Sequence, residues 1–269
     1  MTFQDSNHQT PTQNPVPGNQ QPSNLPPQPG QTRVEVHAAV VNPTATYWII
    51  GITVFFYLLQ IISQSLASVD IPFALLGKIN SAILQGQVWR FFTPALLHGS
   101  ILHIGFNMYA LYVLGRNVEP VYGHKRFVIL YMLGAFGGNV LSFVLSPTAS
   151  LGASTAIFGL LAAELVLILQ NREFFGERSR DIILNLVLVL VVNLAIGLDP
   201  ALGIDLYGHL GGLIAGSIFA ALGGPKFRIE HTDAGFYLKD SRPEKDMWAA
   251  TAIITVAFIV MAFIPFIRR

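Results

Sequence analysis

The sequence predicts an all-α polytopic membrane protein. Of its 269 residues, 52% are hydrophobic and only 12% are charged. Several apolar runs approach the ~20 residues that an α-helix needs to cross a ~30 Å hydrocarbon core. Helices are expected because a backbone surrounded by lipid must satisfy its hydrogen bonds internally. At about 20 residues for each span, the chain is long enough for about seven spans with short connections, which form one membrane domain.

Residues 1–43 are expected to form a disordered tail. They are rich in Gln, Pro, Asn, Thr and Ser and have almost no large apolar side chain before Val34, so they cannot bury a core. They also lack the basic start and short apolar run of a secretory signal peptide. We therefore expect the first span to remain in the mature protein.

Hydropathy predicts seven spans after this tail, near residues 46–66, 95–115, 127–146, 152–170, 181–198, 206–223 and 247–266. The segment 67–94 mixes apolar side chains with Asp70, Lys78 and Arg90, which is typical of a partly embedded interfacial loop. Residues 224–246 carry five basic and five acidic side chains together with Gly and Pro. This composition indicates a solvated loop before the last span.

The distribution of Lys and Arg predicts the orientation in the membrane. With the N-terminus in the cytoplasm, twelve of the sixteen basic residues fall on the inner side, and only Lys78, Arg90, Arg268 and Arg269 fall on the outer side. Cytoplasmic loops are enriched in Lys and Arg, so we expect a multi-pass plasma-membrane protein with a cytoplasmic N-terminus. The fourth and sixth spans then both run inward from the outer face.

These two spans each contain a polar residue among small residues. Ser154 lies in the Gly- and Ala-rich segment 152–160, and His209 lies in the Gly-rich segment 208–216. Gly and Ala allow helices to approach closely, so a serine nucleophile could meet an imidazole base. Taken alone, each residue is more typical of helix packing. The predicted orientation places both a few residues below the outer surface, and this shared depth favours a catalytic pair.

The composition argues against several other chemistries. Without cysteine, the chain has no thiolate nucleophile, disulfide or Cys-ligated metal site. It has no HExxH sequence of a zinc protease and no pair of mid-span aspartates. Its net charge of +1 and its scattered Lys and Arg provide no basic stripe for nucleic acid. We therefore predict no metal, no cofactor and no nucleic-acid partner.

Five motifs, occurring in order, resemble those of the rhomboid family of intramembrane serine proteases across residues 46–223. Besides the Ser and His segments, the matching residues are Trp89-Arg90 in the first loop, His98, His103 and Asn107 in the second span, and Gly115, Glu119 and Gly123 of a GxxxExxxG signature. The resemblance implies a rhomboid-like six-helix catalytic bundle at 44–223, followed by a cytoplasmic loop at 224–246. A seventh transmembrane helix with a short tail would occupy 247–269.

The resemblance also implies that Ser154 is the nucleophile and His209 the general base. A neutral imidazole in an apolar bundle can accept the serine proton and return it to the leaving amine. His103 and Asn107 are four residues apart, so they share one helix face, and both offer N–H donors. By similarity to the family they would stabilise the oxyanion together with the Ser154 backbone N–H. The alternative is that both are interhelical hydrogen-bonding residues.

Four further residues have expected supporting roles. Phe158 shares a helix face with the nucleophile, and its ring can stack on the imidazole of the base. Gly212 begins a GxxxG step that allows the sixth span close to the fourth. Gly152 belongs to the segment that carries the nucleophile. His98 is expected near the membrane entry, facing water.

Four positions raise structural questions. Arg90 and Glu119 resemble a family pair that ties the first loop to the turn after the second span, yet the charge count places them on opposite sides of the membrane. Thr155 stands where the family usually has Gly and is expected to narrow the oxyanion region. Glu164 lies roughly 15 Å deeper than the nucleophile at 1.5 Å per residue, so we expect a protonated or locally paired structural residue.

These features predict an intramembrane serine endopeptidase that cleaves transmembrane helices near their outer end. Its expected partners are the lipid bilayer and single-span or multi-span membrane-protein substrates. By resemblance, the fifth span at 181–198 and the loop 199–205 would form a side gate and a cap. The alternative is a catalytically inactive rhomboid-like protein that binds membrane helices. A transporter is less favoured, because the chain shows no paired half-repeats with broken spans.

Overall fold

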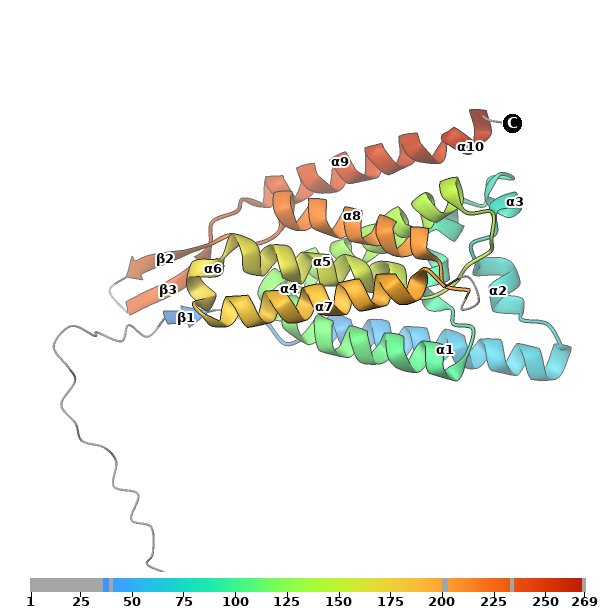
Figure 1. The fold of residues 1–269 in the computed structure, drawn as a ribbon, viewed down its shortest axis with the longest axis horizontal. Helices are drawn as coiled ribbons and strands as arrows, with labels where there is room; N and C mark the ends of the chain where they lie inside the picture. Colours follow the sequence, from blue (N-terminus) through green and yellow to red (C-terminus); the bar gives the residue numbers. More distant parts are fainter. Residues whose placement is uncertain (1–35, 39–40, 200–202, 233–234, 268–269) are drawn as a thin grey trace, which may run out of the picture. The chain divides into compact units, whose positions relative to one another are not determined.

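The computed structural model describes residues 36–38, 41–199, 203–232 and 235–267. Most of the expected N-terminal tail therefore lies outside the described residues. The described chain is mainly helical, with one small sheet (Figure 1). Its elements are β1 (Val36–Ala38), α1 (Thr44–Ala67), α2 (Ile71–Leu76), α3 (Asn80–Ile83), η1 (Val88–Phe91), η2 (Thr93–Leu96), α4 (Ile101–Leu145), α5 (Ser154–Gln170), α6 (Arg172–Phe175), α7 (Arg178–Gly197), α8 (Leu206–Gly223), β2 (Phe227–Thr232), β3 (Gly235–Asp240), α9 (Glu244–Ala262) and α10 (Ile264–Ile267).

The apolar helices correspond to the predicted spans and confirm a polytopic helical membrane protein. Helices α1, α7, α8 and the segment Glu244–Ile267 are long and apolar enough to cross a membrane, and α5 is a shorter apolar helix. Helix α4 has 45 residues, which at ~1.5 Å each would give about 68 Å, more than twice a hydrocarbon core. It supplies two spans, because Gly123 has a φ of 75° and a ψ of 157° and breaks the helix. Figure 1 shows the two halves, 101–122 and 124–145, running in opposite directions.

The second span begins later than the hydropathy predicts. Helix α4 starts at Ile101 rather than near residue 95, because Ser100 caps it by accepting a hydrogen bond from the His103 N–H. The preceding residues form the 3-10 helix η2, which contains Pro94. An apolar 3-10 turn and the start of an apolar helix have the same hydropathy, so the average over a window does not separate them.

The second half of α4 packs with α5 and α8 to form the centre of the bundle. Residues 155–164 of α5 are all buried. A Cβ atom on Gly212 of α8 would lie 1.9 Å from the carbonyl oxygen of Thr155, and one on Gly216 would lie 2.2 Å from that of Gly159. The two helices approach this closely only because α8 has no side chains at these positions. We call this contact, Gly212 and Gly216 against Thr155 and Gly159, the α5–α8 seam.

The outer helices expose most of their apolar side chains. The buried residues of α7 are Ser179 and Gly197, whereas Leu188 and Val191 are more than half exposed. In α1, Trp48 is 73% exposed. Such surfaces match a lipid environment, in which hydrocarbon tails cover apolar side chains without cost.

The segment between α1 and α4 is folded against the bundle rather than being an irregular loop. Lys78 is fully buried, and its amine donates hydrogen bonds to the carbonyl oxygens of Ser146 and Thr148 at 3.0 and 2.8 Å. Its backbone pairs with Ser150 in an isolated antiparallel bridge. Burial lowers the pKa of the Lys78 amine to about 8, opposed by the charge of Asp205. Lys78 thus ties this segment to the connection between α4 and α5.

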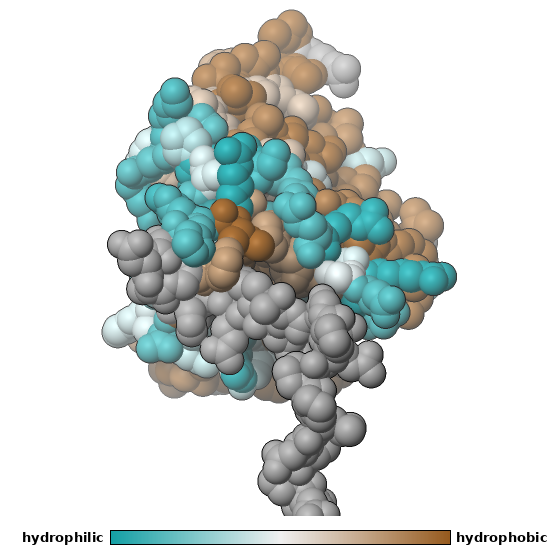
Figure 2. Space-filling view, turned by 90° about the vertical axis from the view of Figure 1, so that its left-hand side faces the viewer, coloured by the Kyte–Doolittle hydropathy of each residue, from teal (hydrophilic) through white to brown (hydrophobic). Residues whose placement is uncertain are grey.

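A small sheet occupies the segment that the sequence analysis treats as a solvated loop. Strands β2 and β3 form an antiparallel hairpin in which Phe227 is opposite Asp240. Strand β1 pairs with β3 in parallel, with Val36 opposite Phe236, so the end of the expected tail joins the sheet. The alternation of apolar and polar residues in 227–230 is a strand signal that the high charge of the segment obscured. Figure 2 shows that this end of the molecule is largely hydrophilic.

Gly212→Ala is expected to destabilise the protein, because the added methyl group would push α8 away from the Thr155 carbonyl. Overpacking of this kind costs about 1–3 kcal/mol, which a melting curve in detergent measures. Gly51→Ala in α1 is the matched control, since nothing lies within 4 Å of its added methyl group. Equal melting temperatures for the two variants would contradict the close packing of the α5–α8 seam.

Candidate active site

The starts of α5 and α8 bring the side chains of Ser154 and His209 into contact. Ser154 is the first residue of α5, and His209 lies in the first turn of α8. The Nε2 atom of His209 lies 2.9 Å from the Oγ atom of Ser154, and His209 is only 7% exposed. Two residues 55 positions apart in the sequence are therefore placed so that the hydroxyl can donate to the imidazole.

The His209 ring is held by packing rather than by a third polar side chain. Phe158 stacks on it, with ring centroids 4.2 Å apart and 13° between the planes. The Nδ1 atom of His209 is buried and has no hydrogen-bond partner in the described part of the chain. The Asp205 carboxylate instead accepts from the Gly208 N–H at 2.9 Å and from the Ser142 hydroxyl at 2.5 Å. Asp205 is thus the N-cap of α8.

Gly152 places the His103 ring beside Ser154. The φ of Gly152 is 131°, a conformation that side-chain-bearing residues rarely adopt. A Cβ atom there would lie 2.9 Å from His103 Nε2 and 3.6 Å from Ser154 Oγ, so both groups flank the same glycine. The Gly99 N–H approaches His103 Nδ1 at 3.4 Å. Donation to Nδ1 leaves the ring proton on Nε2, which makes His103 a donor at this place.

The first turn of α5 adds backbone donors. Ala153, which precedes the helix, makes no side-chain capping hydrogen bond. The first N–H groups of a helix, including that of Ser154, have no partner within the helix. Together with the helix dipole, these groups favour an anion at the helix N-terminus. The N–H of Ser154 and the Nε2–H of His103 are therefore suited to a developing negative charge.

Asn107 lies one helical turn after His103, and its side chain forms a hydrogen bond to the backbone of its own helix. It is 8% exposed, and its Nδ2 atom donates to the His103 carbonyl oxygen at 2.9 Å. A side-chain amide has two N–H groups, so one donor remains after this bond. The observed bond supports the backbone of the residue that presents the imidazole.

His98 does not face water, so that expectation was wrong. It is 1% exposed, and its Nε2 atom accepts from the Ala153 N–H at 3.4 Å. Its ring meets the His103 ring at 71°, with centroids 4.9 Å apart. The burial follows from η2, which packs against the chain before α5 through a hydrogen bond from the Gly152 N–H to the Pro94 carbonyl oxygen at 2.9 Å.

Thr155 faces the centre of the bundle, so the expected narrowing of the oxyanion region was also wrong. A Cβ atom on Gly138 would lie 2.6 Å from the Thr155 Cβ atom, and one on Gly208 would lie 3.0 Å from its methyl group. Glycines of α4 and α8 thus leave the space that this side chain fills. The orientation follows from helix geometry, because adjacent residues point about 100° apart around an α-helix.

Arg90 and Glu119 do not pair. The guanidinium group of Arg90 donates to three oxygens near it in the chain, those of Gln87, Gly77 and Ala74. The Glu119 carboxylate accepts from the N–H groups of Ala45 and Thr46 at 2.8 and 2.7 Å. It therefore caps the start of α1 from another helix. Arg90 precedes α4, whereas Glu119 lies near the far end of its first half, which explains the separation.

The other residues of the GxxxExxxG segment also have structural roles. A Cβ atom on Gly115 would lie 2.4 Å from the Thr46 hydroxyl oxygen, so this glycine lets α1 contact α4. Gly123 forms the break in α4.

Glu164 of α5 has a polar partner on the neighbouring helix α4, because its Oε1 atom accepts from Asn117 Nδ2 at 2.9 Å.

Three residues that support the site, Gln60, Asp70 and Ser142, were not predicted from the sequence. Gln60 accepts from the His98 N–H at 2.9 Å and donates to the Asp70 carboxylate at 2.7 Å. Ser142 binds the cap of α8. A lone polar side chain in an apolar span was the available signal for Gln60, since such residues are costly in a membrane unless they have partners.

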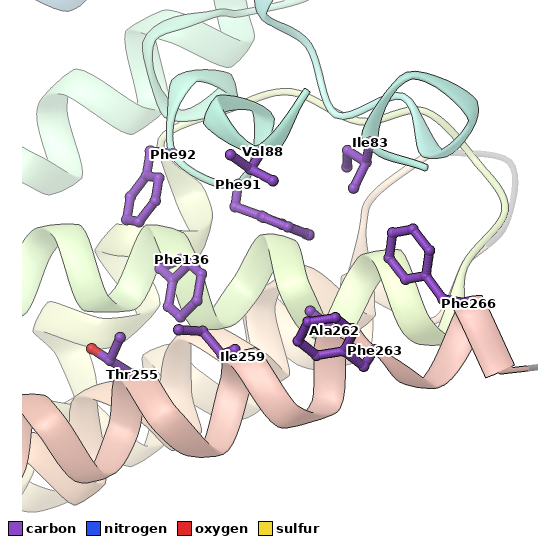
Figure 3. Close-up of a pocket in the computed structure, with 10 residues that line it drawn as sticks. All are labelled: Ile83, Val88, Phe91, Phe92, Phe136, Thr255, Ile259, Ala262, Phe263 and Phe266. Carbon is purple, nitrogen blue, oxygen red and sulfur yellow. The ribbon is translucent and has the colours of Figure 1, made fainter. Parts of the chain in front are cut away.

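An apolar pocket of about 420 Å³ lies apart from these residues, and neither Ser154 nor His209 lines it. Figure 3 shows Phe91 and Phe92 on one side, facing Ile259 and Phe263 of the last transmembrane segment. The lining residues are Ile83, Val88, Phe91, Phe92, Phe136, Thr255, Ile259, Ala262, Phe263 and Phe266. This lining has almost no polar group for chemistry, so the contact between Ser154 and His209 is the better candidate active site.

Comparison with known proteins relates the chain to proteins named as rhomboids. It is 41% identical over 186 residues to Rhomboid protease GluP of Bacillus subtilis (strain 168), a match that covers 69% of this chain and 36% of that protein. It is 33% identical over 175 residues to Rhomboid-like protease 3 of Toxoplasma gondii, covering 63% of this chain and 65% of that protein. RHOMBOID-like protein 1 of Arabidopsis thaliana is 35% identical over 139 residues, covering 51% and 35%. The chain thus spans less than two thirds of the length of these relatives.

The model of the Rhomboid domain matches residues 85–226, which is more than half of the chain. The matched segment includes both Ser154 and His209, the Trp89-Arg90 segment and the GxxxExxxG segment. The helical membrane fold agrees with this match. The chain belongs to the rhomboid family.

Proposed function

We propose that the chain is an intramembrane serine endopeptidase that uses Ser154 as nucleophile and His209 as general base. The observation that carries the proposal is the 2.9 Å contact between the half-buried Ser154 Oγ and Nε2 of the buried His209. Two of the matched relatives are named as proteases, which supports hydrolysis rather than transport. The catalytic domain would comprise residues 44–223, and the helix in 247–269 would be an addition to it.

The reaction follows from the positions of these two side chains. Ser154 Oγ attacks the carbonyl carbon of the scissile peptide bond while His209 Nε2 takes the hydroxyl proton. His209 then gives this proton to the leaving nitrogen, the C–N bond breaks, and an acyl ester remains on Ser154. Water attacks the ester with His209 again as base, which releases the new carboxylate and restores the serine hydroxyl.

The oxyanion would be stabilised by donors that are already in place. These are the Ser154 N–H at the start of α5, the Nε2–H of His103 and the remaining amide N–H of Asn107. Preorganised donors in a site that excludes water are among the largest contributions to acyl transfer. The close contact of Gly152 with His103 and Ser154 supports this arrangement. No metal or cofactor takes part in the proposed reaction.

We propose a plasma-membrane location with the N-terminus in the cytoplasm and the active site open toward the outer face. The hydrophilic end of the molecule in Figure 2 carries β2, β3 and α6, which contain Arg172, Arg228 and Lys239. Basic residues favour the cytoplasmic side. Ser154 lies at the opposite end of α5 from Arg172 of α6, which supports an active site near the outer surface.

The proposed substrates are single-span or multi-span membrane proteins. An intact helix hides its carbonyl groups in internal hydrogen bonds, so a substrate must unwind near its outer end to reach Ser154. We propose that α7 is the side gate, supported by its shallow packing, since its buried residues are Ser179 and Gly197. The proposed cap is the loop 199–205, of which residues 200–202 lie outside the described part of the chain.

Ser154→Ala and His209→Ala are each expected to lower cleavage of a model transmembrane substrate by at least about a thousandfold, because each removes a group that the proton transfer requires. Ser154→Ala should also abolish labelling by a fluorophosphonate in detergent. Ser65→Ala, an exposed hydroxyl on α1, is the matched control. Melting curves would check that all variants fold.

A wild-type protein that binds transmembrane helices but neither cleaves them nor takes the label would contradict the proposal. That result would favour the catalytically inactive membrane-helix-binding protein.

A substrate helix with Ala directly before the scissile bond is expected to be cut much faster than its Phe or Asp version. The reason is the crowding around Ser154, where the backbone of Gly152 leaves no room even for a methyl group beside His103. Mass spectrometry of the products would locate the cleaved bond. Equal cleavage of all three versions, or cleavage in the cytoplasmic half of the helix, would refute the proposed depth and site.

A further inference from the structure

We infer that Gln60, in the second half of α1, is a positioning residue for the proposed active site. It holds the peptide segment formed by His98 and Gly99, and this segment contacts both the turn that carries Ser154 and the ring of His103. The inference rests on the proposed function, since it assigns Gln60 a part in the activity of that site.

The side chain of Gln60 makes two hydrogen bonds on the buried side of α1. It is 4% exposed, and the buried residues of α1 are Thr46, Thr53 and Gln60, all of them polar. Its Oε1 atom accepts from the His98 N–H at 2.9 Å, and its Nε2 atom donates to Asp70 Oδ2 at 2.7 Å. Breaking either bond would leave a buried polar group without a partner, which is unfavourable.

We call the two hydrogen bonds of Gln60, to Asp70 and to the His98 N–H, the Gln60 clamp. The second carboxylate oxygen of Asp70 anchors one end of this clamp. Asp70 Oδ1 accepts from the Phe73 N–H at 2.9 Å and caps α2. The Asp70 carboxylate is therefore anchored at the start of α2, and Gln60 spans the distance from this anchor to the backbone of His98. The side-chain amide of Gln60 has both a donor, which the Asp70 carboxylate requires, and an acceptor, which the His98 N–H requires.

The segment that Gln60 holds reaches both parts of the proposed site. The ring of His98 accepts from the N–H of Ala153 at 3.4 Å, and Ala153 directly precedes Ser154. The next peptide group, the Gly99 N–H, approaches Nδ1 of His103 at 3.4 Å. A displacement of the His98–Gly99 backbone would therefore move the nucleophile and the oxyanion donor together.

Gln60 thus acts on the rate of the chemical step and not on substrate binding. The Gln60 side chain bonds the backbone of His98 and the Asp70 carboxylate, and neither of these is a group proposed to react with the substrate. A displacement of reacting groups by about 1 Å can cost on the order of a hundredfold in rate. Loss of the clamp should therefore reduce kcat while leaving KM nearly unchanged.

The test reverses the direction of one hydrogen bond. Gln60→Met removes both hydrogen bonds at similar side-chain length. Gln60→Glu alone keeps an acceptor for the His98 N–H but places two carboxylates side by side. The double variant Gln60→Glu with Asp70→Asn restores both bonds, because the new amide can donate to the new carboxylate, and its oxygen can still accept from the Phe73 N–H.

The rates are measured on a model transmembrane substrate in detergent, per active site titrated with a fluorophosphonate. We expect kcat to fall about tenfold to a hundredfold for Gln60→Met and for Gln60→Glu, with KM nearly unchanged, and to recover most of that loss in the double variant. Ser63→Ala is the control, because it removes the hydrogen bonds of the Ser63 hydroxyl with the Ile71 N–H and the Gln60 backbone carbonyl. It leaves both side-chain hydrogen bonds of Gln60 in place. It should keep the wild-type kcat.

The positioning role is overturned if both Gln60 variants keep the kcat of Ser63→Ala, or if the double variant is no better than Gln60→Glu. Where Gln60→Met fails to fold, the comparison of Gln60→Glu with the double variant decides alone. A wild-type protein without Ser154-dependent hydrolysis would overturn the proposed function and the positioning role with it. An active wild type with unaffected Gln60 variants would overturn the positioning role only.

Discussion

The close approach of α5 and α8 is the constraint on which the candidate site depends. Gly212 and Gly216 let the two helices pack backbone to backbone, and this contact sets the 2.9 Å distance between Ser154 and His209. The imidazole has no carboxylate partner in the described part of the chain, so its position follows from stacking on Phe158 and from the α8 backbone. Packing therefore does here what a third polar side chain does in a catalytic triad.

Polar contacts attach the outer parts of the fold to this centre. Helices in lipid gain little from burying apolar side chains against one another, so small residues and interhelical hydrogen bonds hold them together. Helix α1 follows this rule, because Glu119 caps its start and Gln60 clamps its second half. Lys78 performs the same task between the first loop and the connection before α5. These contacts surround the proposed site and limit how far its groups can move.

Much of the fold was predictable from the sequence, because each span is an apolar run of nearly the length that a bilayer requires. The hairpin at 227–240 was missed, since its charged residues concealed the two-residue alternation of a strand. At the site, the small residues around Ser154 and His209 indicated a close approach of their helices. The burial of His98 and the direction of Thr155 were not predictable, because they depend on how η2 and the α4 glycines pack. The predicted pairing of Arg90 with Glu119 was wrong for a similar reason. Arg90 bonds the Gly77 carbonyl in the first loop, and Glu119 bonds the start of α1.

In the proposed reaction, Ser154 attacks a carbonyl group whose oxygen is held by the Ser154 N–H and His103. A structure of the protein after reaction with a fluorophosphonate tests this most directly, because the phosphoryl oxygen mimics the oxyanion. We expect phosphorus bonded to Ser154 Oγ, and the phosphoryl oxygen about 3 Å from the Ser154 nitrogen and from His103 Nε2. Phosphorus on another residue, or a phosphoryl oxygen turned away from His103, would contradict it.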